Sequence, residues 1–321
     1  MAEPPYGIIA SKLKRGNVIP FLGAGASLGK RKPPTAKFDP VNRDFLPNAT
    51  ELAAVLAEEA RFPSDDPNER RDLAKVSSYY AEVSGDRPTL RERLRDLLDS
   101  TPKTSLAEAK ASEPLTLHRF LAALPSRQVI VTTNYDSLIE QAFDEAKKPY
   151  DLVIYPADRL TESDYVNSVL WWQHGEEPKP VESKKLDEVL DLLKTPRTVI
   201  FKMHGTRHPS DKSYDHFVVT EEDYVEFLSR MTTQLAIPSI FYPHFRERSF
   251  LFLGYGLRDW NLRVLLKNLP KHTDEQLRSW AIQKNPSELE QMLWGKRDVS
   301  IYDLTLDKFV MKLAREIGLS A

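Results

Sequence analysis

Short apolar runs alternate with helical patterns along the chain. The runs cover residues 17–22, 128–133, 198–203, 249–253, 280–283 and 299–302. They lack strict alternation of polar and apolar positions, which is typical of strands covered on both faces. We therefore expect a doubly wound α/β fold, with a mainly parallel, Rossmann-like sheet of about six strands between layers of helices.

Two longer segments interrupt this framework. Residues 48–124 carry helical periodicity, and Asn48 with Glu51 predicts a helix start because both side chains can bond free backbone N–H groups. Residues 155–196 contain two adjacent tryptophans and a polar stretch. We interpret the first segment as an inserted helical layer or a small subdomain. We interpret the second as a surface insertion, with a lid or an oligomer contact as the alternative. Both belong to a single domain over residues 1–321.

The charge and the amino-acid composition of the chain limit the kinds of site and ligand that it can have. The 321 residues are 41% hydrophobic, and 45 basic against 47 acidic side chains give a net charge of −2. Affinity for nucleic acid or an acidic membrane would therefore need a local patch. The chain has no cysteine, which excludes disulfides, thiolate zinc sites and a cysteine nucleophile. Without a signal-peptide pattern or an apolar run of about 18 residues, we expect a cytoplasmic protein that does not contact the membrane.

A glycine-rich loop follows the first predicted strand. Gly23, Ala24, Gly25 and Ser27 lie where a tight turn can bring a pyrophosphate close to the N–H groups of a helix N-terminus. The spacing G-x-G-x-x-x-G differs from the dinucleotide fingerprint, and no acidic residue about 20 positions later stands out as a ribose partner. A plain strand-to-helix turn is the alternative.

Polar residues and glycines also follow the next three predicted strands. They are Thr133, Asn134 and Asp136, then His204, then Gly254 and Tyr255. The carboxyl ends of parallel strands meet at one edge of a sheet, where such folds bind ligands. Asn134 or Asp136 can also simply cap a helix, and His204 can be a structural hydrogen bonder. Four consecutive strands that end in such chemistry favour a ligand site.

The motifs and their order resemble the sirtuin-like NAD-hydrolase domains of prokaryotic anti-phage defence systems. The matching segments are F-L-G-A-G-A-S at 21–27, T-N-Y-D at 133–136, M-H-G at 203–205, V-T-E-E-D-Y at 219–224 and F-L-G-Y-G-L-R-D at 252–259. Together they extend over residues 17 to about 283. The resemblance implies that NAD⁺ is the substrate and that no metal takes part.

The resemblance also implies a role for each group of residues, in binding the pyrophosphate, the nicotinamide ribose and the adenosine half. It assigns the pyrophosphate to Gly23, Ala24, Gly25 and Ser27. It assigns the nicotinamide ribose to Thr133, Asn134, Asp136 and His204, and the adenosine half to Gly254 and Tyr255. We expect Asn134 to orient water or ribose, Asp136 to supply negative charge near the developing cation, and His204 to act as base.

Two departures separate the chain from protein deacylases of the sirtuin type. A chain without cysteine cannot build their zinc ribbon, and K-R-K-P-P at 30–34 replaces their G-I-P-D-F-R continuation. Gly256 also stands where the defence proteins usually have serine. The resemblance therefore implies an NAD⁺ glycohydrolase that releases nicotinamide and ADP-ribose.

The same resemblance implies how the activity is controlled, and two alternative functions stay open beside it. Because NAD⁺ depletion is toxic, we expect control by a homo-oligomer or by a separate partner such as a HerA-type ATPase or a short Argonaute. A non-hydrolysing NAD- or ADP-ribose-binding sensor or assembly module stays open, although the presence of both Asn134 and His204 disfavours it. A nucleic-acid-processing subunit would use basic residues at 30–32 and 91–95, but acidic residues interrupt the second cluster and favour a solvated helix face.

Overall fold

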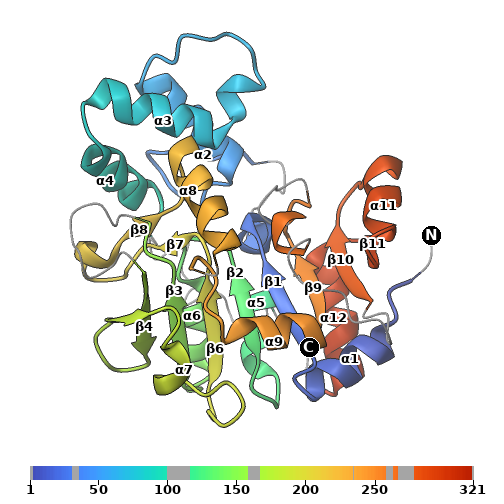
Figure 1. Cartoon of the computed structure of the whole chain (residues 1–321). Coiled ribbons are helices and arrows are strands. Elements are labelled where there is room, and N and C mark those ends of the chain that lie inside the picture. The colour runs from blue at the N-terminus through green and yellow to red at the C-terminus, as the bar shows by residue number, and fades with distance from the viewer. Residues whose placement is uncertain are drawn as a thin grey trace.

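The centre of the protein is a mainly parallel β-sheet. The computed structural model describes residues 3–30, 36–99, 116–157, 167–233, 235–257, 263–266 and 278–319. Within these residues, nine strands form the sheet in the order β11-β10-β9-β1-β2-β6-β3-β4-β5 (Figure 1). The strands are β1 (Val18–Leu22), β2 (Val129–Thr132), β3 (Tyr150–Ile154), β4 (Ser168–Gln173), β5 (Lys179–Glu182), β6 (Thr198–Lys202), β9 (Ser249–Leu253), β10 (Ser279–Gln283) and β11 (Val299–Asp303). Neighbours from β11 to β3 pair in parallel, which confirms the predicted α/β fold.

The expected number of strands, about six, is wrong. All six predicted runs are strands, but β3 joins them beside β6, and β4 and β5 then extend the sheet in antiparallel fashion. The described part of the segment 155–196 thus contributes strands to the central sheet. The pattern missed β3 because Asp151 interrupts its apolar run, and it missed β5 because this edge strand is largely exposed and reads K-P-V-E.

Helices cover both faces of the sheet because successive strand residues point to opposite sides. In β1, Val18 and Leu22 pack in one core cluster, whereas Ile19 and Phe21 pack in the other. The first cluster includes residues from α1 (Tyr6–Lys14), α5 (Leu117–Ala123), α6 (Leu138–Glu145) and α12 (Leu306–Ile317). The second includes residues from α7 (Leu186–Val189), α8 (Glu221–Thr232), α9 (Phe241–Glu247) and α11 (Glu288–Gly295).

A helical layer lies beyond the carboxyl ends of the strands (Figure 1). It consists of α2 (Ala49–Glu59), α3 (Leu73–Ser84) and α4 (Arg87–Leu97), which share a third core cluster. The predicted start of α2 is confirmed: the Asn48 side chain accepts from the Glu51 N–H at 2.9 Å, and the Glu51 carboxylate accepts from the Asn48 N–H at 2.9 Å. Each bond satisfies a backbone donor that the first helical turn leaves unpaired.

Basic residues of α4 are engaged within the protein. Arg93 forms ion pairs with Glu59 and Asp96, and Arg95 pairs with the buried Asp215. These pairs tie the helical layer together and to the β8 (His216–Phe217) region, so the two guanidinium groups have carboxylate partners without any phosphate. The basic residues at 31–32 lie outside the described residues. Among the helices that are described, none is long and apolar enough to cross a membrane.

A buried histidine on α9 makes stability depend on pH. Burial, and then the charges of Arg248 and Arg127, lower the pKa of His244 to about 4. In the unfolded chain a histidine takes up its proton near pH 6.5, so below that value the unfolded state binds more protons than the folded state. We therefore expect the free energy of unfolding to fall as the pH drops from about 6.5 toward 4, by up to about 1.4 kcal/mol per pH unit.

Thermal unfolding across this pH range tests the expectation. His244→Asn removes the titrating ring, so the melting temperature of that variant should change less between pH 6.5 and 4 than that of the parent. His174→Asn, at a half-exposed position, serves as the matched control. Identical pH profiles for the parent and His244→Asn would contradict the assignment.

Candidate active site

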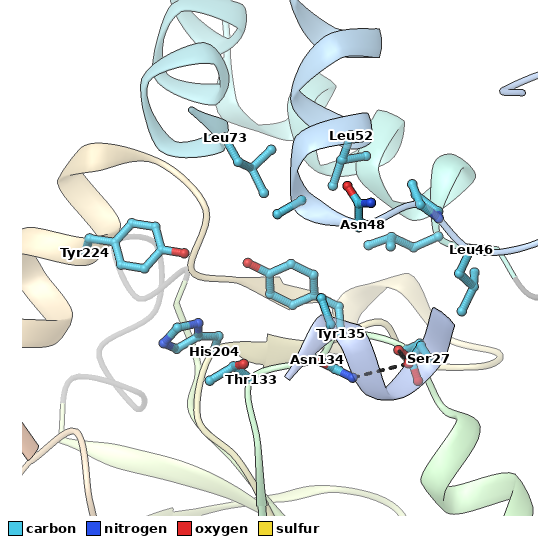
Figure 2. Close-up of a pocket in the computed structure, with 15 residues that line it drawn as sticks. Ser27, Leu46, Asn48, Leu52, Leu73, Thr133, Asn134, Tyr135, His204 and Tyr224 are labelled. Carbon is cyan, nitrogen blue, oxygen red and sulfur yellow. Dashed lines mark hydrogen bonds between the residues drawn. The ribbon is translucent and has the colours of Figure 1, made fainter. Parts of the chain in front are cut away.

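A pocket of about 150 Å³ lies between the carboxyl edge of the sheet and the helical layer. Its floor comes from the segments that follow β1, β2 and β6, and its roof comes from the helical layer. The floor residues include Ala24, Ser27, Thr133, Asn134, Asp136 and His204, and the roof residues include Leu46, Asn48, Leu52, Leu73 and Leu98. Figure 2 shows the labelled roof side chains facing Asn134, Tyr135 and His204. Six of the predicted site residues therefore share one cavity.

The glycine loop is shaped by close contact with the end of β9. A Cβ atom on Gly25 would lie 2.7 Å from the Gly254 carbonyl oxygen, and one on Gly23 would lie 2.6 Å from Tyr255 Cα. Only glycine fits such distances. The Gly25 N–H donates to the Gly254 carbonyl, and the Ala26 N–H donates to the Gly23 carbonyl, each at 2.8 Å. These two amides are already bonded, so the expected N–H cradle for a pyrophosphate is only partly open.

A chain of hydrogen bonds joins the glycine loop to the segment after β2. Asn134 Nδ2 donates to the Gly23 carbonyl at 3.0 Å and to Ser27 Oγ at 3.2 Å. Ser27 Oγ donates to Asp136 Oδ2 at 2.8 Å, and Asp136 Oδ1 accepts from the Leu138 N–H at 3.0 Å. The amide N–H groups of Asn134 are thus used, which leaves its Oδ1 as the acceptor that can meet a ligand. Asp136 both begins the α6 segment and holds Ser27.

His204 follows β6 on the opposite side of the pocket floor. The residue is 3% exposed, and its ring lies edge-on to Tyr224 and Phe227 of α8, with centroid distances of 5.5 and 5.4 Å. Gly205 next to it has a φ of +89°, and a Cβ there would lie 2.0 Å from the His216 carbonyl oxygen. The β7–β8 hairpin (β7, Gly205–Thr206) therefore requires a glycine at this position and helps to fix the histidine.

A comparison with known protein families shows which family the chain belongs to. Residues 128–302 match the SIR2-like domain, which is more than half of the 321 residues. The chain belongs to the SIR2-like domain family. The resemblance inferred from the motifs is thereby confirmed.

Three curated relatives of this SIR2-like domain carry the name NAD(+) hydrolase ThsA. The protein from Acinetobacter baumannii is 26% identical over 313 residues, which is 96% of this chain and 50% of the relative. The protein from Bacillus cereus is 26% identical over 250 residues, with shares of 75% and 42%, and that from Enterococcus faecium is 27% identical over 260 residues, with shares of 80% and 41%. The chain spans half or less of the length of these relatives.

Gly254 and Tyr255 of the SIR2-like domain do not line the pocket. The Tyr255 ring is buried against Phe21 and Phe252, with centroids 4.8 and 6.3 Å away. Gly254 has a φ of +64° and contacts the glycine loop. Packing accounts for both residues without a ligand, and the expected contact with the adenosine half stays a prediction. The end of this motif, Arg258 and Asp259, lies outside the described residues.

Two tyrosines of the pocket were not assigned a role from the sequence. Tyr135 Oη donates to the Val218 carbonyl at 2.6 Å, so this side chain links the T-N-Y-D segment to the residue just before the V-T-E-E-D-Y segment. Tyr224 belongs to that second segment and lines the cavity beside His204. The signal that could have found them is their place inside the T-N-Y-D and V-T-E-E-D-Y segments, next to residues with an assigned role.

A buried ion pair supports the floor of the SIR2-like site from below. Lys202 Nζ, on a fully buried side chain, donates to Glu140 Oε1 at 2.6 Å and to the Asp136 carbonyl at 2.7 Å. Burial raises the pKa of the Glu140 carboxyl, and the Lys202 ammonium opposes that rise. The pair therefore couples α6 and β6 to the segment that carries Asp136. Within the described ranges, no three His, Cys, Asp or Glu side chains are grouped so that they could hold a metal ion.

Proposed function

We propose that this SIR2-like domain hydrolyses NAD⁺ to nicotinamide and ADP-ribose. The observation that carries the proposal is the convergence of Asn134, Asp136 and His204, from two different strand ends, on one pocket. The relatives named NAD(+) hydrolase support the choice of substrate and reaction. We further propose that the reaction depletes NAD⁺ in an anti-phage defence system, under the control of an oligomer or a partner.

The hydrolysis of NAD⁺ needs chemical groups that these residues can supply. Nicotinamide leaves a cationic pyridinium as a neutral molecule, so cleavage of the glycosidic bond needs no strong general acid. It needs stabilisation of an oxocarbenium-like ribose and a well-placed water. In this proposal Asn134 Oδ1 accepts a hydrogen bond from the ribose or the water, and the Ser27–Asp136 pair supplies negative charge. His204 takes the proton from the water or from a ribose hydroxyl.

The size of the pocket limits what it can hold in this conformation. Ligand pockets for drug-sized molecules usually span about 300 to 1,000 Å³, and this cavity is about half the lower figure. It suits the nicotinamide ribose end of the dinucleotide. We therefore infer that the apolar roof, including Leu52 and Leu73, moves away from the floor when the whole of NAD⁺ binds.

Product analysis tests the proposed reaction. The purified protein, incubated with NAD⁺, should release equal amounts of nicotinamide and ADP-ribose, measured by chromatography. NADH is the matched control, because its uncharged dihydronicotinamide ring is a poor leaving group and should stay attached. A dilution series, with and without a HerA-type ATPase or a short Argonaute, reports whether assembly controls the rate. Binding of NAD⁺ with no products under any of these conditions would favour the sensor module instead.

A further inference from the structure

Arginines precede the amino ends of six neighbouring parallel strands, at the edge of the sheet opposite the candidate active site. Each lies within three residues of its strand: Arg297 before β11, Arg278 before β10, Arg248 before β9, Arg15 before β1, Arg127 before β2 and Arg197 before β6. These strands are consecutive in the sheet, and neighbouring strands lie about 4.8 Å apart. Side chains that are far apart in the sequence therefore gather along one edge.

Four of these arginines line a second pocket, of about 190 Å³. They are Arg248, Arg15, Arg127 and Arg197, which precede four adjacent strands in the order β9-β1-β2-β6. Apolar residues, among them Val129, Leu192 and Val199, complete the lining. The cavity is therefore a concave surface that combines cationic groups with an apolar wall.

The four guanidinium groups have few carboxylate partners. Arg197 pairs with the buried Asp151 at 3.4 Å, and Arg127 donates to the neutral carbonyls of Leu193 and Thr195. Neither Arg15 nor Arg248 forms a side-chain hydrogen bond or ion pair with another residue of the described part. Among the described residues, three of the four positive charges in the pocket therefore lack a carboxylate at hydrogen-bond distance.

Arg248 is the most informative of these residues. Its side chain is half-buried, and burial lowers the pKa of the guanidinium although the neighbouring Glu247 opposes this. The ends of α1 and α9, at Arg15 and Arg248, offset part of the charge through their helix dipoles. A dipole leaves the guanidinium N–H donors available, and a half-buried cation without a hydrogen-bonded partner costs free energy. An anion in the pocket would remove that cost.

Gln128 belongs to the same lining, but its side chain is almost fully buried. Its side chain is 2% exposed, and Nε2 donates to the Leu13 carbonyl and to Ser126. Its Oε1 is buried and has no hydrogen-bond partner among the residues that the structure describes. The buried Oε1 is not accessible from the open cavity, so the pocket offers a ligand mainly the charged donors of its arginines, and that ligand must carry an anionic group.

We propose that this pocket binds the phosphorylated sugar of a small metabolite, either a free sugar phosphate or a nucleotide. Arginine forks match phosphate oxygens in a bidentate manner, and the apolar wall of Val129, Leu192 and Val199 can contact the carbon skeleton of the sugar. The ligand sits at the amino edge of the sheet, so its binding does not depend on the activity proposed for the carboxyl edge.

Isothermal titration with ribose 5-phosphate and with AMP tests the proposal. The parent should bind at least one of them, with tighter binding of AMP identifying a nucleotide and equal binding identifying the sugar phosphate alone. Arg248→Met should weaken binding by about tenfold or more, because it removes a charge-assisted contact. Arg15→Ala should also weaken it, whereas Arg71→Ala, which removes an exposed arginine between α2 and α3, should leave it unchanged.

Thermal unfolding of the same variants separates binding from folding. Arg248→Met removes an unpaired, half-buried charge, so its melting temperature without ligand should equal or exceed that of the parent. Equal affinity in the parent and Arg248→Met, or no binding of either compound to the parent, would overturn the proposal. Binding of a nucleic acid duplex in place of both small molecules would overturn it as well.

Discussion

Replacement of Asn134 by alanine is expected to lower NAD⁺ hydrolysis by about 100-fold or more, with the fold retained. The change removes the Oδ1 acceptor from the pocket and also the two hydrogen bonds that hold Gly23 and Ser27. His204→Ala should have a similar effect, because it removes the proposed base and leaves the glycine loop intact. Both variants should still bind NAD⁺, since neither change touches the Gly25–Gly254 contact.

Nicotinamide release and NAD⁺ binding, measured side by side, distinguish catalysis from affinity. Asn42→Ala and His174→Ala change the same residue types outside the pocket and should keep the parent rate. If Asn134→Ala and His204→Ala hydrolyse NAD⁺ as fast as the parent, the assignment of the site is wrong even if the reaction is right. If all variants bind NAD⁺ and none hydrolyses it, including the parent, the reaction itself is wrong.

Lys202→Met is expected to lower the free energy of unfolding by about 3 to 5 kcal/mol, because it leaves the Glu140 carboxylate buried without a partner. The double variant Lys202→Met/Glu140→Leu should recover most of that loss, since an apolar pair of similar size replaces the buried ion pair. Denaturant unfolding measures the free energy of unfolding of both variants. The double variant also lacks the bond from Nζ to the Asp136 carbonyl, so its hydrolytic rate should stay low while its stability recovers.

The matched control for this pair is Lys179→Met, which removes an exposed lysine whose ion pair with Glu176 lies at the surface. Surface pairs contribute little, so its unfolding free energy should stay within about 1 kcal/mol of the parent. A Lys202→Met variant as stable as the parent would contradict the expected cost of burying the Glu140 carboxylate without the ammonium group.

The sequence was informative where strands are uniformly apolar and where chemistry follows a strand directly. Asn134, Asp136 and His204 were predicted because they occupy the positions after two such strands. Strand β3 was missed because its interior holds Asp151, whose charge is acceptable only beside Arg197, a residue distant in the sequence. Local patterns contain no information about such a partner.

The roof of the pocket could not be predicted for a related reason. Leu52 and Leu73 follow ordinary helical periodicity, and only the packing of the helical layer over the sheet turns them toward His204 and Asn134. The same holds for Lys202, which was part of a predicted strand but acquires its role from Glu140 on another element. Tyr255 shows the reverse, since a residue that follows a strand end proved to be part of the core.

The pairing of β1 with β9 also governs when the hydrolytic centre can assemble during synthesis. Val18 is paired with Ser249, and the glycine loop is bonded to Gly254, so contacts of the site join chain segments more than 200 residues apart. At a translation rate of about 5 to 20 residues per second, the loop leaves the ribosome on the order of ten seconds or more before its partner strand exists. Nascent chains and fragments truncated before β9 should therefore be inactive, and contacts of such high sequence separation also slow folding. In the cell, the complete site therefore forms only after nearly the whole sheet has formed.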